Sequence, residues 1–346
     1  MEKPEQYSKK CRQMIQQNMA VPSPVRASLR VNNCCNSHCR YCWAWQRSII
    51  NPAIDNMKFA VDQLADIGVC GISITGGEPF IYQNLPALVK YIRDYGIICI
   101  VLTNGVLLGI PSITLPVLDA GLNLICLSLD TVNPEAYYAI RGIPLEPILK
   151  GLDYVLEQRK YYPELNISVS CVISKVNINI LEELIKYLSE RGVTIDFQAL
   201  HPIFGAKSME NHSIKFTEED LPQLITLSEK LLRMKQDGYL IDSNADYLAA
   251  FPDFSVYRKL PSNFECTSGF TMLAIDYNLD VMSCWPMPPI GNLRKTSLSN
   301  LWQSELYNNR RLEMLEVKCP GCWLRCHTEH RSEEAMKKFI QWHVNI

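Results

Sequence analysis

The sequence has almost no net charge, no long apolar run and no secretion signal. Its 34 basic and 36 acidic residues leave a formal charge of −2, and this balance creates no field to attract a phosphate backbone, so a nucleic-acid partner is not expected. The N-terminal segment is polar and lacks the apolar core of a signal peptide. Apolar runs such as residues 97–102 have strand length and are too short to cross a membrane. We therefore expect a cytoplasmic protein with no membrane partner.

Cysteine, in contrast, is abundant, with 14 residues in a chain of 346. In a reducing compartment, clustered cysteines indicate metal ligands or catalytic thiols before they indicate disulfides. Nine of them fall into two groups, an early group of Cys34, Cys35, Cys39 and Cys42 and a late group of Cys266, Cys284, Cys319, Cys322 and Cys326. The two groups therefore predict two metal sites.

An alternation of short apolar runs and amphipathic segments fills the first two hundred residues. The runs are rich in Ile, Val and Leu, as strands buried on both faces should be, and they cover residues 27–32, 71–75, 97–103, 122–129, 166–173 and 193–200. Helices are expected at 55–67, 84–95, 134–140, 147–157 and 179–191. Six such units predict an α/β fold with a parallel sheet, a partial (β/α)6 TIM-like barrel.

The pattern changes after residue 201. A helix is expected at 217–236, a hairpin at 271–276 and 280–284, and further helices at 297–316 and 332–344. We therefore expect a leader segment at 1–25, the barrel at 26–236, a linker region at 237–262, a small α+β domain at 263–330 and a C-terminal helix at 331–346. The small domain contains the late cysteines.

The early cysteines directly follow the first predicted strand. Cys35, Cys39 and Cys42 are spaced CxxxCxxC, and three thiolates this close can hold one cubane cluster while leaving one iron open. The spacing of Cys34, Cys39 and Cys42 also fits a plant-type ferredoxin, and paired cysteines can hold zinc. Local spacing alone leaves these alternatives open.

A second motif, Gly76-Gly77-Glu78-Pro79, directly follows the second predicted strand. Paired glycines let the backbone approach a small ligand closely, although the same residues also suit an ordinary turn. The two motifs together, in this order and at these strand ends, resemble the radical SAM superfamily over about residues 26–205. The resemblance implies a [4Fe–4S] cluster on Cys35, Cys39 and Cys42, and S-adenosylmethionine (SAM) bound to the open iron.

The resemblance also implies the chemistry. Reductive cleavage of SAM gives a 5′-deoxyadenosyl radical, which takes a hydrogen atom from the substrate, and the electron comes from a donor such as flavodoxin or ferredoxin. Positions that match the superfamily's cofactor-binding residues are Tyr41, Gly76, Gly77, Glu78, Asn104, Ser128 and Arg141. Tyr41 is expected to face adenine, and Arg141 to meet the carboxylate of SAM. Cys34 departs from the pattern and leaves the ligand register open.

The late cysteines bracket the predicted hairpin and a following helix. Their arrangement, Cys266-x17-Cys284 and then Cys319-x2-Cys322-x3-Cys326, resembles the SPASM/twitch extension of radical SAM enzymes. It implies one auxiliary [4Fe–4S] cluster, with the choice of four ligands among the five cysteines open. A structural zinc site that includes His327 or His330 is the alternative.

These features predict a radical SAM enzyme of oxidoreductase type. About 25 residues precede the first strand, too few for a leader-peptide recognition domain, so we expect a small natural-product intermediate or a short peptide as substrate. Oxidation or rearrangement with an auxiliary cluster is the first hypothesis. The alternatives are epimerisation, with Cys126 or Cys171 as hydrogen donor if it faces the barrel lumen, and an iron–sulfur electron carrier that is not an enzyme.

Overall fold

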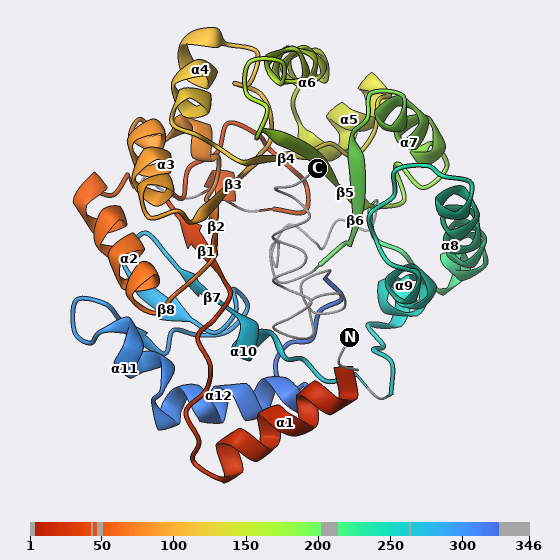
Figure 1. The fold of residues 1–346 in the computed structure, drawn as a ribbon. Helices are drawn as coiled ribbons and strands as arrows, with labels where there is room; N and C mark the ends of the chain where they lie inside the picture. Colours follow the sequence, from red (N-terminus) through yellow and green to blue (C-terminus); the bar gives the residue numbers. More distant parts are fainter. Residues whose placement is uncertain (1–3, 43, 47–50, 202–213, 263, 325–346) are drawn as a thin grey trace.

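The fold is known from a computed structural model that describes residues 1–346 except 1–3, 43, 47–50, 202–213, 263 and 325–346 (Figure 1). In the described part, nine strands form one sheet in the order β6-β5-β4-β3-β2-β1-β7-β8-β9. The first six strands are parallel neighbours: β1 Arg26–Arg30, β2 Gly71–Thr75, β3 Ile98–Thr103, β4 Leu124–Ser128, β5 Asn166–Ile173 and β6 Thr194–Ala199. The expected partial barrel is therefore confirmed.

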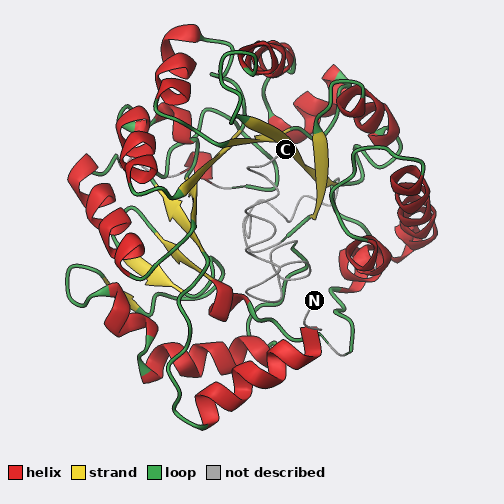
Figure 2. Cartoon of the chain, in the orientation of Figure 1, coloured by secondary structure: helices red, strands yellow, loops and turns green. Residues whose placement is uncertain are grey.

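Helices surround the outer side of the curved sheet (Figure 2). Six of them connect the parallel strands: α2 Ile54–Asp66, α3 Leu85–Asp94, α4 Pro111–Asp119, α5 Pro134–Arg141, α6 Glu146–Gln158 and α7 Leu181–Ser189. Only α4 was not expected from the sequence. It is short, mostly apolar and contains Pro116, so it lacks the amphipathic period that identifies the others.

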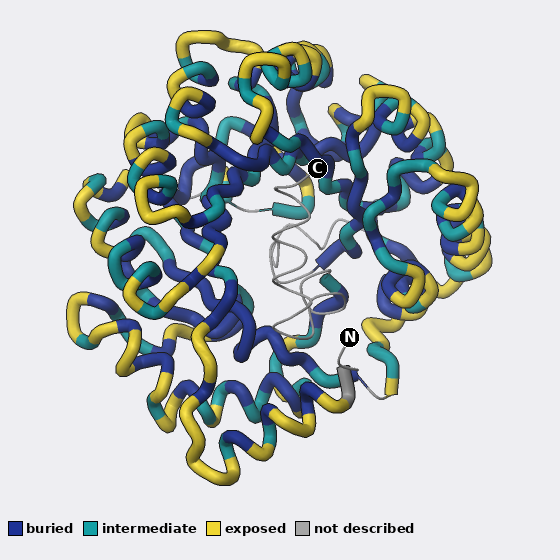
Figure 3. Tube along the Cα trace, in the orientation of Figure 1, coloured by how far each residue is buried: buried dark blue, intermediate teal, exposed yellow. Residues whose placement is uncertain are grey.

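The side chains of β1 show how the sheet separates its two faces. Ala27 and Leu29 are fully buried against the helices, in the core that Figure 3 colours dark blue. Arg26, Ser28 and Arg30 alternate with them and are partly exposed. Because successive side chains of a strand point to opposite faces, these three lie on the concave side of the sheet, which we call the inner face.

The stretch expected to be a linker contains α9, Ala245–Tyr257. Asn244 begins this helix, since its side chain accepts a hydrogen bond from the backbone N of Tyr247 at 2.7 Å. Tyr247, Phe251 and Phe254 are buried along one side, and α9 packs on α8, Leu221–Gln236. Their 4- and 3-residue spacing is helical, so the interpretation of this stretch as a linker is wrong.

The C-terminal part extends the barrel sheet. After the short helix α10, Ser268–Thr271, β7 Met272–Ile275 pairs in parallel with β1, and β8 Asp280–Met282 forms the expected hairpin with β7. Strand β9, Gly291–Asn292, completes the sheet. Instead of one helix at 297–316, the chain forms α11 Leu298–Trp302 and α12 Glu305–Leu315, because Ser304 caps a new start. The expected helix at 332–344 lies outside the described residues.

The N-terminal segment is structured. Helix α1, Pro4–Gln16, lies beside α12 (Figure 1), and the Nε of Arg12 donates to Glu265 at 3.1 Å. The following chain is held by Gln303, which bonds both the N and the O of Val21. We did not predict this helix, because its stability comes from packing on the C-terminal part. In the described residues, no helix has the length and hydrophobicity needed to cross a membrane.

Candidate active site

The loop after β1 carries the early cysteines at the carboxyl end of the sheet, where barrel folds place their chemistry. Helix α5 ends against this loop: the carbonyl of Arg141 accepts from the N of His38 at 3.0 Å, and the carbonyl of Ile140 accepts from the N of Arg40 at 3.0 Å. Gly142 ends α5 with a φ of +66°, and a Cβ there would lie 2.9 Å from the Cβ of His38. The cysteine loop is therefore fixed to the barrel through backbone contacts.

The glycine motif meets the cysteine loop with no intervening space. The N of Glu78 donates to the carbonyl of Cys34 at 2.8 Å, and a Cβ on Gly77 would lie 1.9 Å from that same carbonyl oxygen. Asn32 completes the contact by donating to the carbonyl of Glu78 at 2.8 Å and accepting from the N of Gly77 at 3.0 Å. The two motif loops are therefore in direct contact, and Cys34 takes part in this contact through its backbone.

Glu78 is 1% exposed, and protein donors surround its carboxylate. One oxygen accepts from the Thr103 hydroxyl at 2.7 Å and the Phe80 N at 3.0 Å, while the other accepts from the Asn104 N at 2.7 Å. Burial raises the pKa of Glu78 to about 6, against the lowering effect of these three bonds. A carboxylate has about four acceptor positions, so one position is left for a further donor.

Donor groups also approach the cysteine sulfurs. The Nδ2 of Asn104 lies 3.6 Å from the Sγ of Cys35 and donates to Asn36 at 2.7 Å. The hydroxyl of Ser37 lies 3.3 Å from the Sγ of Cys39. Burial raises the pKa of Cys35 to about 12, so this thiol ionises only when a metal or a positive charge stabilises the thiolate.

Arg141 is not a solvated side chain. Its Nε and Nη2 donate to the two carboxylate oxygens of Asp130 at 2.6 and 3.0 Å, and its Nη1 lies 3.9 Å from the Sγ of Cys39. The Tyr41 hydroxyl donates to the same carboxylate at 3.0 Å. Burial lowers the pKa of Arg141, but the negative charge and hydrogen bonds of Asp130, together with Tyr41 and Cys39, outweigh burial and that pKa is raised. Two expected residues therefore meet at Asp130.

Sequence reasoning missed Asp130, Asn32 and Thr103 as site residues. Asp130 is fully buried and also accepts from the N of Val172 at 2.8 Å. It lies two residues after Ser128, and an acidic residue next to a strand end was the available signal. Asn32 and Thr103 gave no such signal, because a polar residue at the end of a strand is common.

Of the two cysteines considered as hydrogen donors, only Cys126 is on the inner face. Cys126 pairs with Leu102 and Ser168 and is partly exposed. It shares its face with Ser128, which is two residues further along β4. Cys171 is fully buried on the other face, with its thiol 3.6 Å from the carbonyl of Asp130.

Four late cysteines line one cavity beside the hairpin. They are Cys266, Cys284, Cys319 and Cys322, and the side chains of Met287 and Met314 complete an apolar wall. Cys326, His327 and His330 lie outside the described residues. The cavity is small, with a volume of about 20 Å³, and its thiol lining is the donor set of an iron–sulfur cluster.

A zinc ion and an iron–sulfur cluster gather their cysteine ligands differently. Within the described ranges, no three His, Cys, Asp or Glu side chains are arranged to hold one metal ion. A zinc ion needs all its sulfur ligands at about 2.3 Å from one point. A cubane cluster binds each cysteine to a different iron, so its ligands are spread more widely. In the described part of the chain, both sites offer thiols as donors, and such a donor set suits an iron–sulfur cluster.

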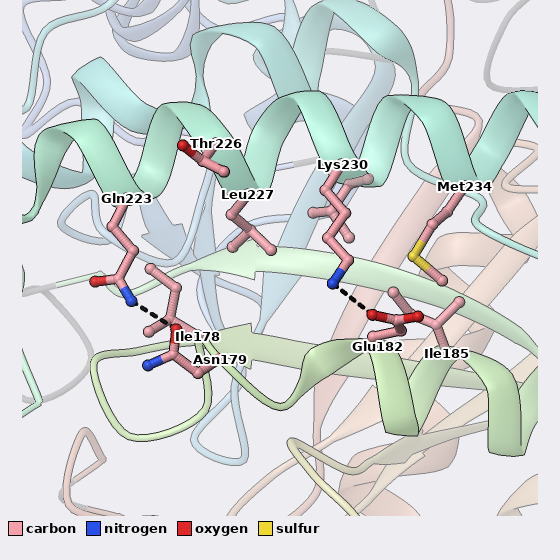
Figure 4. A pocket seen from close by; sticks show the side chains of 10 residues that line it. Ile178, Asn179, Glu182, Ile185, Gln223, Thr226, Leu227, Lys230 and Met234 are labelled. Atoms are coloured by element: carbon pink, nitrogen blue, oxygen red, sulfur yellow. Dashed lines mark hydrogen bonds and ion pairs between the residues drawn. The ribbon is translucent and has the colours of Figure 1, made fainter.

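A further groove lies outside the barrel, between α7 and α8 (Figure 4). Lys230 forms an ion pair with Glu182 across it, and Gln223 donates to Asn179 at 2.6 Å. Lys186 and Lys230 lower the pKa of Glu182 to about 2. These polar contacts join the two helices across the groove. None of the site residues discussed above lines this groove, so it is separate from the candidate active site.

Two family models match the chain. The Radical SAM superfamily model matches residues 29–188, and the SPASM model, an iron–sulfur cluster-binding domain, matches residues 266–327. Together the two matches cover more than half of the chain. Such domains imply a SAM-binding [4Fe–4S] cluster and an auxiliary iron–sulfur cluster.

Curated relatives are similar over part of their length. The GTP 3′,8-cyclase of Sulfurimonas denitrificans is 30% identical over 230 residues, which are 63% of this chain and 65% of the relative. The probable GTP 3′,8-cyclase of Methanococcus vannielii is 28% identical, over 60% of this chain and 70% of its own. A SAM-dependent nucleotide dehydratase of Selenomonas ruminantium is 27% identical, over 44% and 57%. The chain thus spans between about half and 70% of these relatives.

Two solved structures share the fold. Streptococcus suis SuiB bound to its precursor peptide SuiA has a TM-score of 0.65 at 18% identity, covering 88% of this chain and 70% of that chain. The enzyme anSMEcpe with bound AdoMet and a peptide has a TM-score of 0.64 at 17% identity, covering 93% and 100%. The family matches, in the same order as the two cysteine groups, identify this protein as a member of the radical SAM superfamily, a radical SAM enzyme with a C-terminal SPASM-type domain.

Proposed function

We propose that Cys35, Cys39 and Cys42 hold the SAM-binding cluster at the carboxyl end of the barrel. The observation that carries this proposal is the direct contact of the two motif loops, in which Gly77 leaves no room for a side chain against Cys34. When bound, the cluster supplies the electron that cleaves SAM, and the resulting radical takes a hydrogen atom from the substrate. The protein provides position, charge and exclusion of water.

The residues around the site have separate tasks in this proposal. Glu78 belongs to the loop that is expected to meet the amine of SAM, and the acceptor position left on its carboxylate can take a hydrogen bond from that amine. Asn104, Ser37 and Arg141 hold Cys35 and Cys39 through the sulfur contacts described above. Because Asp130 already binds the Nε–Nη2 edge of Arg141, only the Nη1 side of the guanidinium is available for the carboxylate of SAM.

A polar small molecule is the proposed substrate. The inner face of β4, β5 and β6 carries Ser128, Ser168, Ser170 and Asp196, which offer hydrogen bonds to hydroxyl and amine groups. Relatives named for GTP or nucleotide substrates favour nucleotide-like compounds as the first class to test. A short peptide is the second class, since a structure of similar fold holds a peptide.

We propose oxidation or rearrangement as the reaction, with an auxiliary cluster on Cys266, Cys284, Cys319 and Cys322 to exchange an electron with the substrate. Flavodoxin or ferredoxin is the proposed reductant. Epimerisation is the second candidate, because Cys126 lies on the inner face as a hydrogen donor must. An epimerase incorporates one solvent deuterium and loses activity in Cys126→Ala, whereas Cys171→Ala, which alters the outer face, leaves the deuterium count unchanged.

Anaerobic reconstitution tests the two-cluster assignment. We expect about eight irons per chain, four for each cubane, and release of 5′-deoxyadenosine when dithionite and SAM are added. Replacing Cys35, Cys39 and Cys42 by alanine should remove about four irons and abolish 5′-deoxyadenosine. Cys70→Ala is the matched control, since Cys70 is exposed and precedes β2 at the other end of the strand. Eight irons bound without release of 5′-deoxyadenosine would indicate an electron carrier and refute the proposed enzymatic function.

A further inference from the structure

Trp285 directly follows Cys284, and its indole reaches the inner face of β1. The indole Nε1 donates to the hydroxyl of Ser28 at 3.0 Å. The guanidinium carbon of Arg30 lies 4.1 Å from the centre of the Trp285 ring, well within cation–π range. A neighbour of one proposed auxiliary ligand is therefore bound by two side chains of the first barrel strand.

β1 is also the strand that leads into the first cysteine loop. Arg30 is its last residue and precedes Cys35 by five positions. Arg30 thus joins Trp285 to the strand end that leads into the first cysteine loop.

The chain around Cys284 needs such an anchor. Strand β8 ends at Met282, and β9 starts only at Gly291. In this loop, two backbone bonds set the path, from Met287 N to the carbonyl of Cys284 at 3.0 Å and from Ile290 N to that of Val281 at 2.7 Å. Both bonds lie inside the small domain. The indole contacts tie the same loop to the barrel, and a large rigid ring does so at low cost in conformational entropy.

We propose that Ser28, Arg30 and Trp285 are positioning residues that set the placement of the auxiliary-cluster loop relative to the first cysteine loop. The proposal rests on the proposed function, in which Cys284 holds the auxiliary cluster. The three side chains act by holding the loop that contains Cys284. They thereby set the distance and the electronic coupling between the two clusters. Cluster potentials depend on hydrogen bonding, charge and exposure, so a displaced loop changes the potential as well.

Trp302 offers a matched control for the hydrogen bond of the indole. Its indole Nε1 also donates one hydrogen bond, to the carbonyl of Pro22 at 2.9 Å, and its ring also stacks with a guanidinium, that of Arg311 at 4.2 Å. Neither partner belongs to β1. Trp302→Phe therefore removes the same kind of hydrogen bond as Trp285→Phe, keeps an aromatic ring, and leaves the contact between the two cysteine loops untouched.

The test uses the full chain with both clusters reconstituted, reduced with dithionite and examined by electron paramagnetic resonance. Trp285→Ala should change the spin–spin interaction between the clusters and shift the auxiliary midpoint potential, while Trp302→Phe leaves both as in the unsubstituted chain. Trp285→Phe and Ser28→Ala each remove the same hydrogen bond, worth about fivefold in the population of the correctly held loop. Their double variant should then equal either single variant, because their effects are not additive.

Two results would overturn the inference. In one, Trp285→Ala retains the spectrum and the potential of the unsubstituted chain with about eight irons bound. In the other, Trp302→Phe produces the same shift, which would mean that Trp285 contributes only to general packing and has no specific positioning role. An unsubstituted chain that binds only about four irons would instead refute the auxiliary site itself, so the failure of the proposed function is distinguishable from that of this inference.

Discussion

The exchange Glu78→Gln keeps the shape of a buried side chain but changes its hydrogen-bonding capacity. The two carboxylate oxygens of Glu78 both accept from backbone N–H groups, those of Phe80 and Asn104. Glutamine has one oxygen acceptor and one NH₂ donor. In either orientation, its NH₂ group faces one of these N–H donors, so one buried donor loses its partner.

The size of the effect depends on pH. An unpaired buried donor costs about 1–3 kcal/mol. Against this, burial raises the pKa of Glu78 from 4.5 to about 6, which costs the native protein about 2 kcal/mol above pH 6. The sign follows from linkage: a raised pKa favours the folded state fully below pH 4.5, and that contribution is lost as pH rises through 6. Glutamine does not titrate, so the stability lost in the variant should shrink by about 2 kcal/mol between pH 4 and pH 7.

Urea denaturation under argon, followed by tryptophan fluorescence, measures this difference at each pH on the cluster-loaded chain without SAM. Glu164→Gln is the control, since the side chain of Glu164 is 72% exposed and pairs with Arg93 only at the surface, and its effect should be small at every pH. If Glu78→Gln lowers the free energy of unfolding by the same amount at every pH from 4 to 7, the raised pKa of Glu78 and the reasoning built on it are refuted.

Three further predictions concern the packing around the two cysteine groups. Gly77→Ala should prevent stable cluster assembly, because its Cβ would lie 1.9 Å from a backbone oxygen that cannot move away, and iron content measures this. Asp130→Asn should cost about 3–5 kcal/mol in urea denaturation, because it leaves the buried charge of Arg141 without its partner. Burial lowers the pKa of His201 to about 4, with its ring bonded to the carbonyl of Gly321 at 2.9 Å. Its contribution to stability should therefore be complete above pH 6.5 and fall by about 2 kcal/mol at pH 5. His201→Gln should remove this loss of stability at acid pH, which we call the acid limb.

Each of these has a matched control or a contradicting outcome. Gly68→Ala places a Cβ with no atom within 4 Å at a φ of +82°, so it should cost only about 1 kcal/mol and leave iron content unchanged. Asp94→Asn breaks an exposed ion pair with Lys90, which is worth about 0.3–0.5 kcal/mol. The assignment of the acid limb to His201 fails if His201→Gln keeps the same loss of stability between pH 7 and pH 5.

The strands of the barrel could be predicted because each one is a local apolar run. β2 and β5 have the bounds expected from the sequence, and the other four differ by at most two residues at either end. Of the helices that were missed, α4 and α9 each contain an internal proline, and α1 is polar except for a few positions on the side that packs on α12. Their stability comes from tertiary contacts, which local periodicity does not record.

By itself, the sequence determined the two groups of cysteines, their order with the glycine motif and the parallel alternation of strands and helices, because spacing along the chain and apolar period are local properties. Only the tertiary structure decided which distant groups meet. It joined β7 to β1, so that the small domain continues the barrel sheet; it turned Arg141 toward Asp130; and it brought Trp285 to Ser28, 257 positions earlier in the chain. Such pairings depend on which buried partner is within reach after folding, and a charge, an indole or a strand edge carries no mark of its partner in the sequence around it.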